Sequence, residues 1–125
     1  VAGRINSTWG GNLVDIVRFD RILEIIEEDE LVENAAQMGR VLQRHLVDLS
    51  ERFDFVTRPR GRGLMCAFDL PTTEIRDRVR KIAFDKGLLI LGCGTSTLRF
   101  RPRLAITEDE LDEGIGILTD ALSDL

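Results

Sequence analysis

Metal ligands and long apolar runs are scarce in this chain of 125 residues. Its two cysteines, Cys66 and Cys93, are too few and too far apart for a zinc cluster, and its single histidine, His45, has no companion imidazole. No apolar run approaches the roughly 20 residues that cross a bilayer, and the first residues do not resemble a signal peptide. We therefore expect no metal site, no membrane segment and a cytoplasmic location.

Positive charge is also in deficit, since 17 Lys and Arg stand against 22 Asp and Glu, which gives a formal net charge of -5. Arg58, Arg60 and Arg62 cluster locally, but the acidic residues elsewhere outweigh them. A nonspecific nucleic-acid binder needs the opposite balance, so we expect a small-molecule partner and no nucleic acid. The length and the 43% hydrophobic content suit one ordinary domain with a real core.

Apolar residues at helical spacing predict four helices, at about 12–28, 31–53, 73–87 and 107–122. Three of them have polar residues suited to an N-cap: Asn12, then Thr72 or Thr73, and then Thr107, which opens a Thr-Glu-Asp-Glu capping box. The stripe of the second helix is continuous over several turns, which is typical of a core face and predicts packing, not a cofactor contact.

Strand signals fill the spaces between the second and fourth helices. An alternation from Phe53 to Thr57 meets Pro59 and a predicted turn at 60–63, and the apolar run 64–70 follows as a buried strand. Two further strands, 88–91 and 97–101, flank a flexible connection at 92–96. The order helix, helix, strand, strand, helix, strand, strand, helix predicts an α/β fold, in the α+β sense of a small sheet covered by helices on one face.

The turn before the first helix has the composition of an anion-binding site. Thr8 offers a hydroxyl, Gly10 and Gly11 permit close backbone approach, and the helix that begins after Asn12 has a positive end. These features favour a phosphate ligand. The alternative is that the segment is only a turn that opens a helix. Trp9 is expected to pack beside the turn.

Arg99 is the second candidate, on a strand where Leu98 and Phe100 point one way and Arg99 and Arg101 the other. A guanidinium binds a carboxylate through two hydrogen bonds, so Arg99 suits an amino or keto acid. The alternative is a solvated or salt-bridged strand face, and Arg101 and Arg103 share that ambiguity.

Apart from Thr8 and Arg99, the sequence offers no side chain with a clear reactive role. Cys66 lies in an apolar strand and is expected in the core, and Cys93 lies in a glycine loop with no histidine near in sequence. Lys81 and Lys86, the only lysines, are expected to be solvated on a helix. The chain therefore offers no catalytic residue of its own.

At this point a family resemblance becomes specific. Ser7-Thr8-Trp9-Gly10-Gly11-Asn12 resembles the (S/T)-T-(F/W)-G-G-N segment of class III (omega-amino acid) aminotransferases, which use pyridoxal 5′-phosphate. Further matching stretches occur in the family's order at 26–28, 31–35, 60–65, 98–102 and 107–110. Within the class the chain most resembles the L-lysine 6-aminotransferases, with acetylornithine, ornithine and 4-aminobutyrate aminotransferases as relatives.

The resemblance implies the C-terminal part of a fold-type I enzyme, in which 1–28 leave the large domain and 29–125 form the small domain. It assigns Thr8, with Ser7, to the cofactor phosphate of the neighbouring subunit in a homodimer, and Asn6 to the substrate at the mouth of the site. It assigns Arg99 to the carboxylate of the amino acid donor or of 2-oxoglutarate.

The resemblance also implies what this segment does not contain. The family's cofactor-bonding lysine, its pyridine-binding aspartate and its stacking aromatic all precede the matching region, so the isolated chain is expected to lack transaminase activity. Pro102-Arg103-Leu104 replaces the family's usual Pro-Pro-Leu, which predicts a differently shaped or more basic turn beside the substrate. The competing hypothesis is a noncatalytic, stand-alone α/β interaction domain that keeps these motifs.

Overall fold

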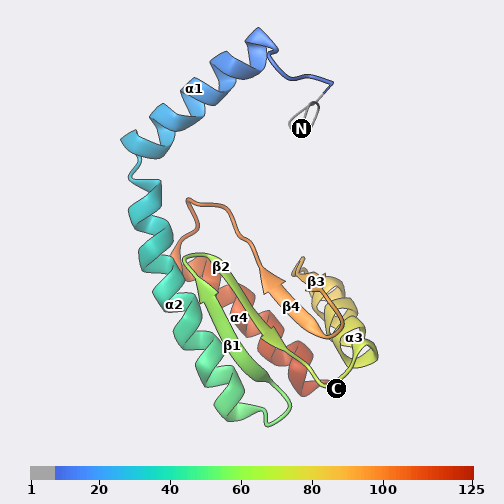
Figure 1. Ribbon diagram of the computed structural model, residues 1–125. Coiled ribbons are helices and arrows are strands. Elements are labelled where there is room, and N and C mark those ends of the chain that lie inside the picture. The colour runs from blue at the N-terminus through green and yellow to red at the C-terminus, as the bar shows by residue number, and fades with distance from the viewer. Residues whose placement is uncertain (1–7) are drawn as a thin grey trace. The chain divides into compact units, whose positions relative to one another are not determined.

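A computed structural model describes residues 8–125 as four helices and four strands in the predicted order (Figure 1). Ser7 and Asn6, predicted to bind the cofactor phosphate and the substrate, lie outside the described residues. The elements are α1 (Leu13–Glu28), α2 (Leu31–Arg52), β1 (Thr57–Arg62), β2 (Met65–Asp69), α3 (Thr73–Asp85), β3 (Leu91–Cys93), β4 (Thr97–Phe100) and α4 (Glu108–Ser123).

The contacts divide the chain into two compact units, Val1–Val32 and Glu33–Leu125. The first unit contains α1, and no residue of that helix is buried. The second unit contains the whole sheet and nearly all of α2. The predicted boundary between 1–28 and 29–125 concerns the family's large and small domains, and it stays a prediction.

The second unit is built on one four-stranded antiparallel sheet with strand order β1-β2-β4-β3. The chain passes from β2 to β3 through α3. These two strands are therefore not neighbours in the sheet, and β4 lies between them. Along β4 the side chains alternate, so that Leu98 is fully buried and Arg99 points to the opposite face. The expected small sheet with helices on one face is confirmed, and the other face carries the polar residues.

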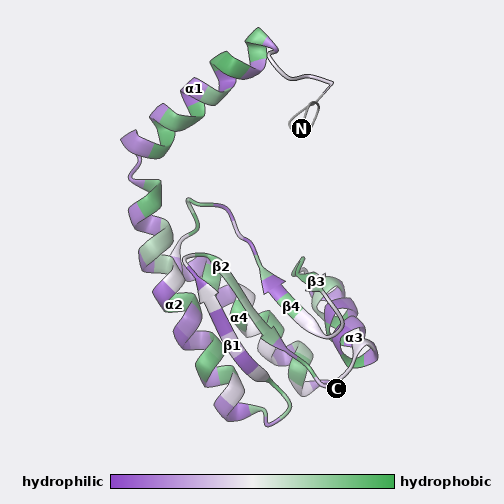
Figure 2. Cartoon of the chain, viewed as in Figure 1, coloured by the Kyte–Doolittle hydropathy of each residue, from purple (hydrophilic) through white to green (hydrophobic). Residues whose placement is uncertain are grey.

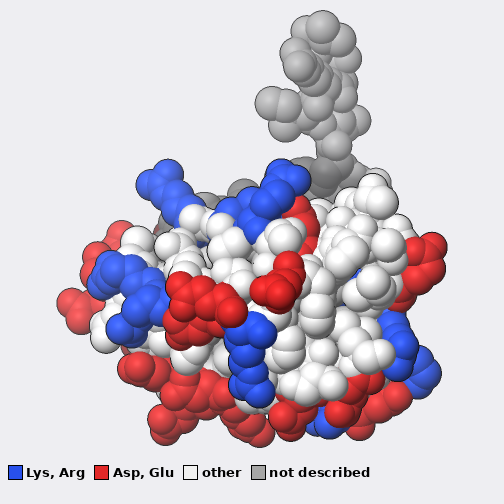
Figure 3. Space-filling model, turned by 90° about the horizontal axis from the view of Figure 1, so that it is seen from below, with Lys and Arg blue, Asp and Glu red and all other residues white. Residues whose placement is uncertain are grey.

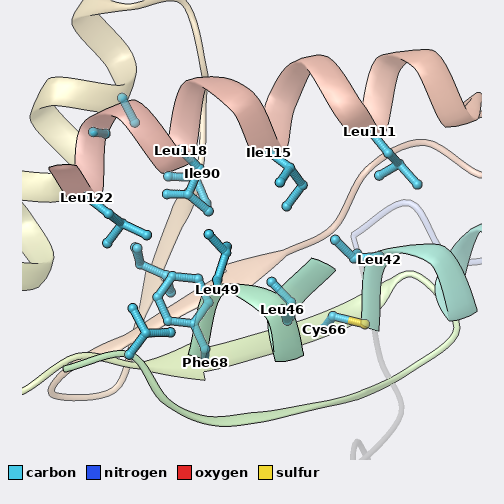
Figure 4. Close-up of a cluster of buried hydrophobic side chains, with 14 of the residues drawn as sticks. Leu42, Leu46, Leu49, Cys66, Phe68, Ile90, Leu111, Ile115, Leu118 and Leu122 are labelled. Carbon is cyan, nitrogen blue, oxygen red and sulfur yellow. The ribbon is translucent and has the colours of Figure 1, made fainter. Parts of the chain in front are cut away.

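The core lies between the sheet and the helices α2 and α4 (Figure 4). The α2 stripe supplies Leu42, Leu46 and Leu49, and the whole predicted stripe of α4 is buried: Leu111, Ile115, Leu118 and Leu122. Cys66 and Phe68 project into the same core from β2. Because the stripe residues of α2 and α4 recur every three or four positions, burying one face of each helix removes the whole stripe from water.

Helix α2 approaches the β1–β2 turn closely enough to require glycine at position 39. A Cβ atom on Gly39 would lie 2.5 Å from the carbonyl carbon and oxygen of Gly63. Gly63 itself has a φ of 52°, which is in the left-handed region that favours glycine. This contact fixes where the β1–β2 hairpin sits against α2.

The predicted helix caps are confirmed where the structure resolves the choice. The side chain of Asn12 accepts from the Val14 N–H at 2.9 Å, and Thr72, not Thr73, caps α3 by accepting from Ile75 N–H. Thr107 and Glu110 form both halves of the capping box on α4. Each cap satisfies N–H groups that the first turn of a helix leaves free.

Two strand boundaries were predicted wrongly. Phe53 and Phe55 precede the first strand, and residues 60–62, predicted as a turn, lie within β1. Pro59 does not stop pairing because β1 is an edge strand, where a missing N–H costs no ladder bond. A register shift between Thr57 and Arg60, with Arg58 at a φ of 54°, accommodates the irregularity.

The third strand was also misplaced. Gly92 and Cys93, expected in a flexible connection, pair with β4 as part of β3, whereas 88–90 are not in a strand. The connection between β3 and β4 is short, and α3 holds it: Thr73 Oγ1 donates to Thr95 O at 2.8 Å and Arg76 Nη1 to Gly94 O at 2.9 Å. Arg76 is buried, which the apolar pattern of α3 did not indicate.

The surface agrees with the acidic composition. Figure 3 shows acidic and basic side chains together on the face seen from below, with acidic ones along its lower edge. Among the residues that the structure describes, no helix is long and apolar enough to cross a membrane. The same residues contain no group of three or more His, Cys, Asp or Glu side chains suited to a metal ion.

Candidate functional site

The two candidate site residues that the structure describes belong to different units, Thr8 to the first and Arg99 to the second. Thr8 opens a turn that is closed by a hydrogen bond from Asn12 N–H to Trp9 O at 3.1 Å. Gly11 has a φ of 81°, and a Cβ atom there would meet nothing within 4 Å. The turn therefore presents an exposed hydroxyl and uncrowded backbone at the N-terminus of α1.

This arrangement has the chemistry that a phosphate needs. A helix N-terminus carries free N–H groups and a partial positive charge, and short side chains let an anion come close. Trp9, expected to pack beside the turn, is 72% exposed, so that expectation was wrong. An exposed indole next to an open turn leaves room for a further surface to cover both.

Arg99 lies in the middle of the sheet on β4. Its cross-strand partners are Ala67 on β2 and Leu91 on β3, so strands flank it on both sides. Its Nε atom is buried and makes no hydrogen bond to any described residue, and none of the described carboxylates pairs with it. Buried polar groups in folded proteins nearly always have a partner, so an orphaned guanidinium nitrogen points to a missing ligand or a missing part of the protein.

A polar network lies beside Arg99 on the same face of the sheet. Asp69 accepts hydrogen bonds from Thr97 Oγ1 at 2.6 Å and from Arg60 Nη2 at 2.8 Å, and Arg58 Nη1 lies 3.3 Å from its second oxygen. Burial alone would raise the pKa of the Asp69 carboxyl, but these hydrogen bonds and the charges of Arg60 and Arg58 together hold it below its usual value.

The network separates two kinds of arginine on one sheet face. Arg58 and Arg60 are paired with Asp69, whereas Arg99, one row further along β4, has no such partner. Of these three arginines, Arg99 is therefore the one whose positive charge stays available to a ligand. The sequence indicated the Arg58–Arg62 cluster but not its acidic partner, because Asp69 becomes adjacent only through the β1–β2 pairing.

Arg99 is one of the residues that line a cavity of about 260 Å³. Apolar side chains form most of its wall, and they come from the segment before β3, from the loop after β4 and from α4: Leu88, Ile90, Pro102, Ile106, Leu111 and Ile115. Glu110 also lines it. Arg101 lines the cavity together with Arg99, and an apolar wall beside such cations strengthens their attraction for a carboxylate, because less water screens it.

The sequence position of Arg103 predicted a more basic loop after β4. In the structure Arg103 does not make this loop more basic. Its guanidinium pairs with Glu110, which also accepts from the Thr107 N–H in the capping box of α4. The Arg103 hydrogen bond, the bond from Thr107 N–H and the Arg103 charge lower the pKa of the Glu110 carboxyl to about 2. The charge of Arg103 is therefore balanced within the loop and the helix that follows it.

The remaining reactive residues have structural partners. Cys66 is buried in the core as expected, and burial raises the pKa of its thiol, so it is a poor nucleophile. Lys81 Nζ lies 2.7 Å from Asp85, and Lys86 Nζ lies 3.1 Å from Asp124. His45 is half-buried beside the apolar stripe of α2, and its Nε2 lies 2.9 Å from Asp112 on α4.

Comparisons with known proteins cover the whole chain. A family model described as aminotransferase class-III matches residues 1–122. The L-lysine-epsilon aminotransferase of Amycolatopsis lactamdurans is 50% identical over 125 residues, which cover 98% of this chain and 28% of that protein. The mitochondrial 4-aminobutyrate aminotransferase of Sus scrofa is 38% identical over 122 residues, which cover 97% of this chain and 24% of that protein.

A comparison with a solved structure shows that the fold is also similar to that of an aminotransferase. The lysine aminotransferase from Mycobacterium tuberculosis superposes with a TM-score of 0.90 and 46% sequence identity, covering 99% of this chain and 29% of that one. The chain thus spans less than a third of the length of the relatives that it matches. Within that span, both the sequence and the fold agree from end to end.

Proposed function

This chain belongs to the class III aminotransferases, and we propose that the protein containing it transfers the terminal amino group of L-lysine to 2-oxoglutarate with pyridoxal 5′-phosphate as cofactor. The observation that carries the proposal is Arg99, a strand arginine with an unpartnered buried nitrogen beside an apolar cavity. The donor and the acceptor are both amino or keto acids, and each has a carboxylate for this guanidinium to bind.

The residues of the first unit fit the phosphate of the cofactor. The exposed Thr8 hydroxyl, the open Gly11 position and the start of α1 form a neutral set of donors, which suits a dianion. Ser7 joins Thr8 in this proposal. When bound, pyridoxal 5′-phosphate supplies an electron sink that makes the amine-bearing carbon acidic and lets nitrogen pass between donor and acceptor.

The contribution of this chain to the reaction is binding and orientation. Arg99 holds the carboxylate, which places the amine or ketone end of the substrate at a constant distance from it. Asn6 is proposed to contact the substrate at the mouth of the site. Lys81 and Lys86 are engaged in ion pairs on α3, so we assign the proton-transferring and cofactor-bonding residues to the part of the relatives' length that this chain does not span.

The proposal includes a homodimer in the cytoplasm, with Thr8 and Ser7 serving the cofactor of the neighbouring subunit. Its support is the family resemblance, together with the exposed apolar side chains of α1, which need a protein surface to cover them. The preference for lysine is supported by 50% identity to a lysine-epsilon aminotransferase, compared with 38% to a 4-aminobutyrate aminotransferase.

The test uses the intact protein and the substitution Arg99→Ala. Charge-assisted hydrogen bonds contribute about 1.5–3 kcal/mol each, so KM for 2-oxoglutarate should rise about ten- to hundredfold. Arg62→Ala is the matched control, because Arg62 is an exposed arginine of the same sheet with no ion pair to a described carboxylate. An unchanged KM together with a lower melting temperature would make Arg99 a structural residue.

A panel of donors identifies the amine. Lysine, ornithine, acetylornithine and 4-aminobutyrate are compared at a constant 2-oxoglutarate concentration, and lysine is expected to give the highest kcat/KM. A higher value for another donor would correct the donor and leave the role of Arg99 intact. No turnover with any donor, for a protein that binds the cofactor, would favour the noncatalytic interaction domain.

A further inference from the structure

The loop after β4, residues 101–107, forms one wall of the cavity beside Arg99. Pro102 and Ile106 line that cavity, and Arg99 itself lies only two residues before the loop begins. No strand or helix includes residues 101–106, so ladder hydrogen bonds do not hold this loop in place. Its position must come from side-chain contacts.

Asn34, near the start of α2, makes the long-range contacts to this loop. Its side-chain amide nitrogen donates to Leu104 O at 2.7 Å and to Ile106 O at 3.1 Å, which lie 70 and 72 residues further along the chain. A primary amide nitrogen carries two protons, so both are used on the same loop. One side chain thereby satisfies two carbonyl groups that have no partner in regular secondary structure.

Two other polar contacts involve the loop, and its Ile106 also packs against the hydrophobic core. Ile106 N–H donates to Arg103 O at 3.2 Å in a local turn, and Arg103 pairs with Glu110 of α4. Both connect the loop with itself or with the helix that directly follows it. Among these three polar contacts, Asn34 alone connects the loop to α2, an element from the other end of the second unit.

We propose that Asn34 is a positioning residue of the carboxylate site: its two hydrogen bonds hold the wall that confines Arg99 and the bound carboxylate. The inference rests on the proposed function, because it assumes a carboxylate at Arg99. Asn34 touches neither substrate nor cofactor. It acts through Leu104 and Ile106, and loosening the loop lets Pro102 and Ile106 withdraw from the cavity and admit water around the guanidinium.

The choice of variants follows from the two donated protons. Asn34→Ala removes both donors, and Asn34→Asp keeps the shape but places carboxylate oxygens against two carbonyl oxygens. Gln37→Ala is the matched control, since Gln37 is an exposed amide on the same helix and donates to no described residue. Arg103→Ala loosens the same loop from its other end and leaves the Glu110–Thr107 cap in place.

The measurements are made on the intact protein with cofactor bound. Asn34→Ala is expected to raise KM for 2-oxoglutarate about tenfold, because small displacements of a positioned group are costly. We expect kcat to stay within about twofold and cofactor affinity to stay unchanged, with Asn34→Asp at least as impaired as Asn34→Ala. Arg103→Ala should raise the same KM, and the double variant should show less than the product of the two effects, because both residues hold one loop.

Three results separate the possible failures. A KM within twofold of the parent in Asn34→Ala, or equal losses of kcat and cofactor binding, overturns the role of Asn34. If an Asn34 variant does not fold, Arg103→Ala decides, and an unchanged KM in that variant overturns the inference. If Arg99→Ala leaves KM for 2-oxoglutarate unchanged, the carboxylate site itself is wrong, and that failure belongs to the proposed function.

Discussion

Helices α1 and α2 follow each other in the chain but have opposite relations to the core. α2 buries six residues along one stripe, whereas α1 buries none. In Figure 2 apolar and polar residues alternate along α1 without forming one continuous stripe. Its exposed apolar residues lie all around the helix: Leu13, Val14, Ile16, Val17, Phe19, Ile22, Leu23 and Ile25. Charged residues lie between them, so α1 has no single apolar face, and contact with one surface cannot cover all of its apolar side chains.

This difference shows where the segment around Arg99 and the segment around Thr8 each get their stability. The Arg99 half lies on a sheet whose core is complete within residues 33–125. The Thr8 half lies at the start of a 16-residue helix that has no buried residue of its own. Isolated helices of that length are marginal in water, so the phosphate turn depends on protein that packs around α1.

The largest expected effect tests this difference directly. Leu46 is fully buried in α2, and Leu46→Ala should lower the free energy of unfolding of the chain by about 2–5 kcal/mol through the lost contacts and the cavity left behind. Val17→Ala on α1, where the side chain is 69% exposed, should change it by less than about 0.5 kcal/mol. Urea denaturation followed by circular dichroism measures both, and equal losses would show that α1 has a core of its own.

The second effect concerns the phosphate turn in the intact protein. Thr8→Ala removes the hydroxyl and should weaken binding of the cofactor about tenfold, as expected for one charge-assisted hydrogen bond. Thr8→Ser, which keeps the hydroxyl, should restore most of the affinity. Equilibrium dialysis against cofactor gives the dissociation constants, and equal values for the parent and the alanine variant would remove the phosphate role from Thr8.

The smallest effect is electrostatic and belongs to the second unit. The pKa of Asp69 is lowered in the folded state, so its contribution to stability is fully present above its unfolded value of about 3.8 and is lost as pH falls through the folded pKa. Asp69→Asn should therefore be less stable than the parent at neutral pH. The gap between the two should narrow as pH falls below about 3.8.

Urea midpoints measured at a series of pH values check this behaviour. The parent should lose stability more steeply than Asp69→Asn on the acid side, because only the parent takes up a proton at residue 69. Parallel curves would mean that the bonds from Arg60 and Thr97 do not depend on the charge of Asp69. That outcome would also remove the distinction between the paired arginines and Arg99.

Most of the fold could be predicted because it depends on local patterns. The apolar stripes of α2 and α4 and the Thr107–Glu110 capping box are written in residues three or four apart, and helices depend on such spacing. The strands were harder. Pro59 is tolerated only because β1 lies at the edge of the sheet, and edge or centre is a property of the whole sheet.

The residues of the candidate site also divide into those that local signals predicted and those that the sequence did not reveal. Thr8 and Arg99 were predicted because a glycine turn before a helix and an alternating strand are local signals, and the family resemblance then connected them. Asp69 and Asn34 were missed because their partners are distant in sequence: Arg60 and Thr97 for Asp69, and Leu104 and Ile106 for Asn34. A sequence search for polar residues at element ends would include Asn34 but could not supply its partner.

The sequence by itself determined the family, the order of the elements, the helix caps and the two residues proposed to bind phosphate and carboxylate. Only the tertiary structure decided which arginines are neutralised, which leave charge for a ligand, and which side chain holds the wall beside Arg99. The physical reason is that charge pairing and loop anchoring depend on distances between atoms. Those distances are set when β2 pairs with β1 and β4 and when α2 meets the loop after β4.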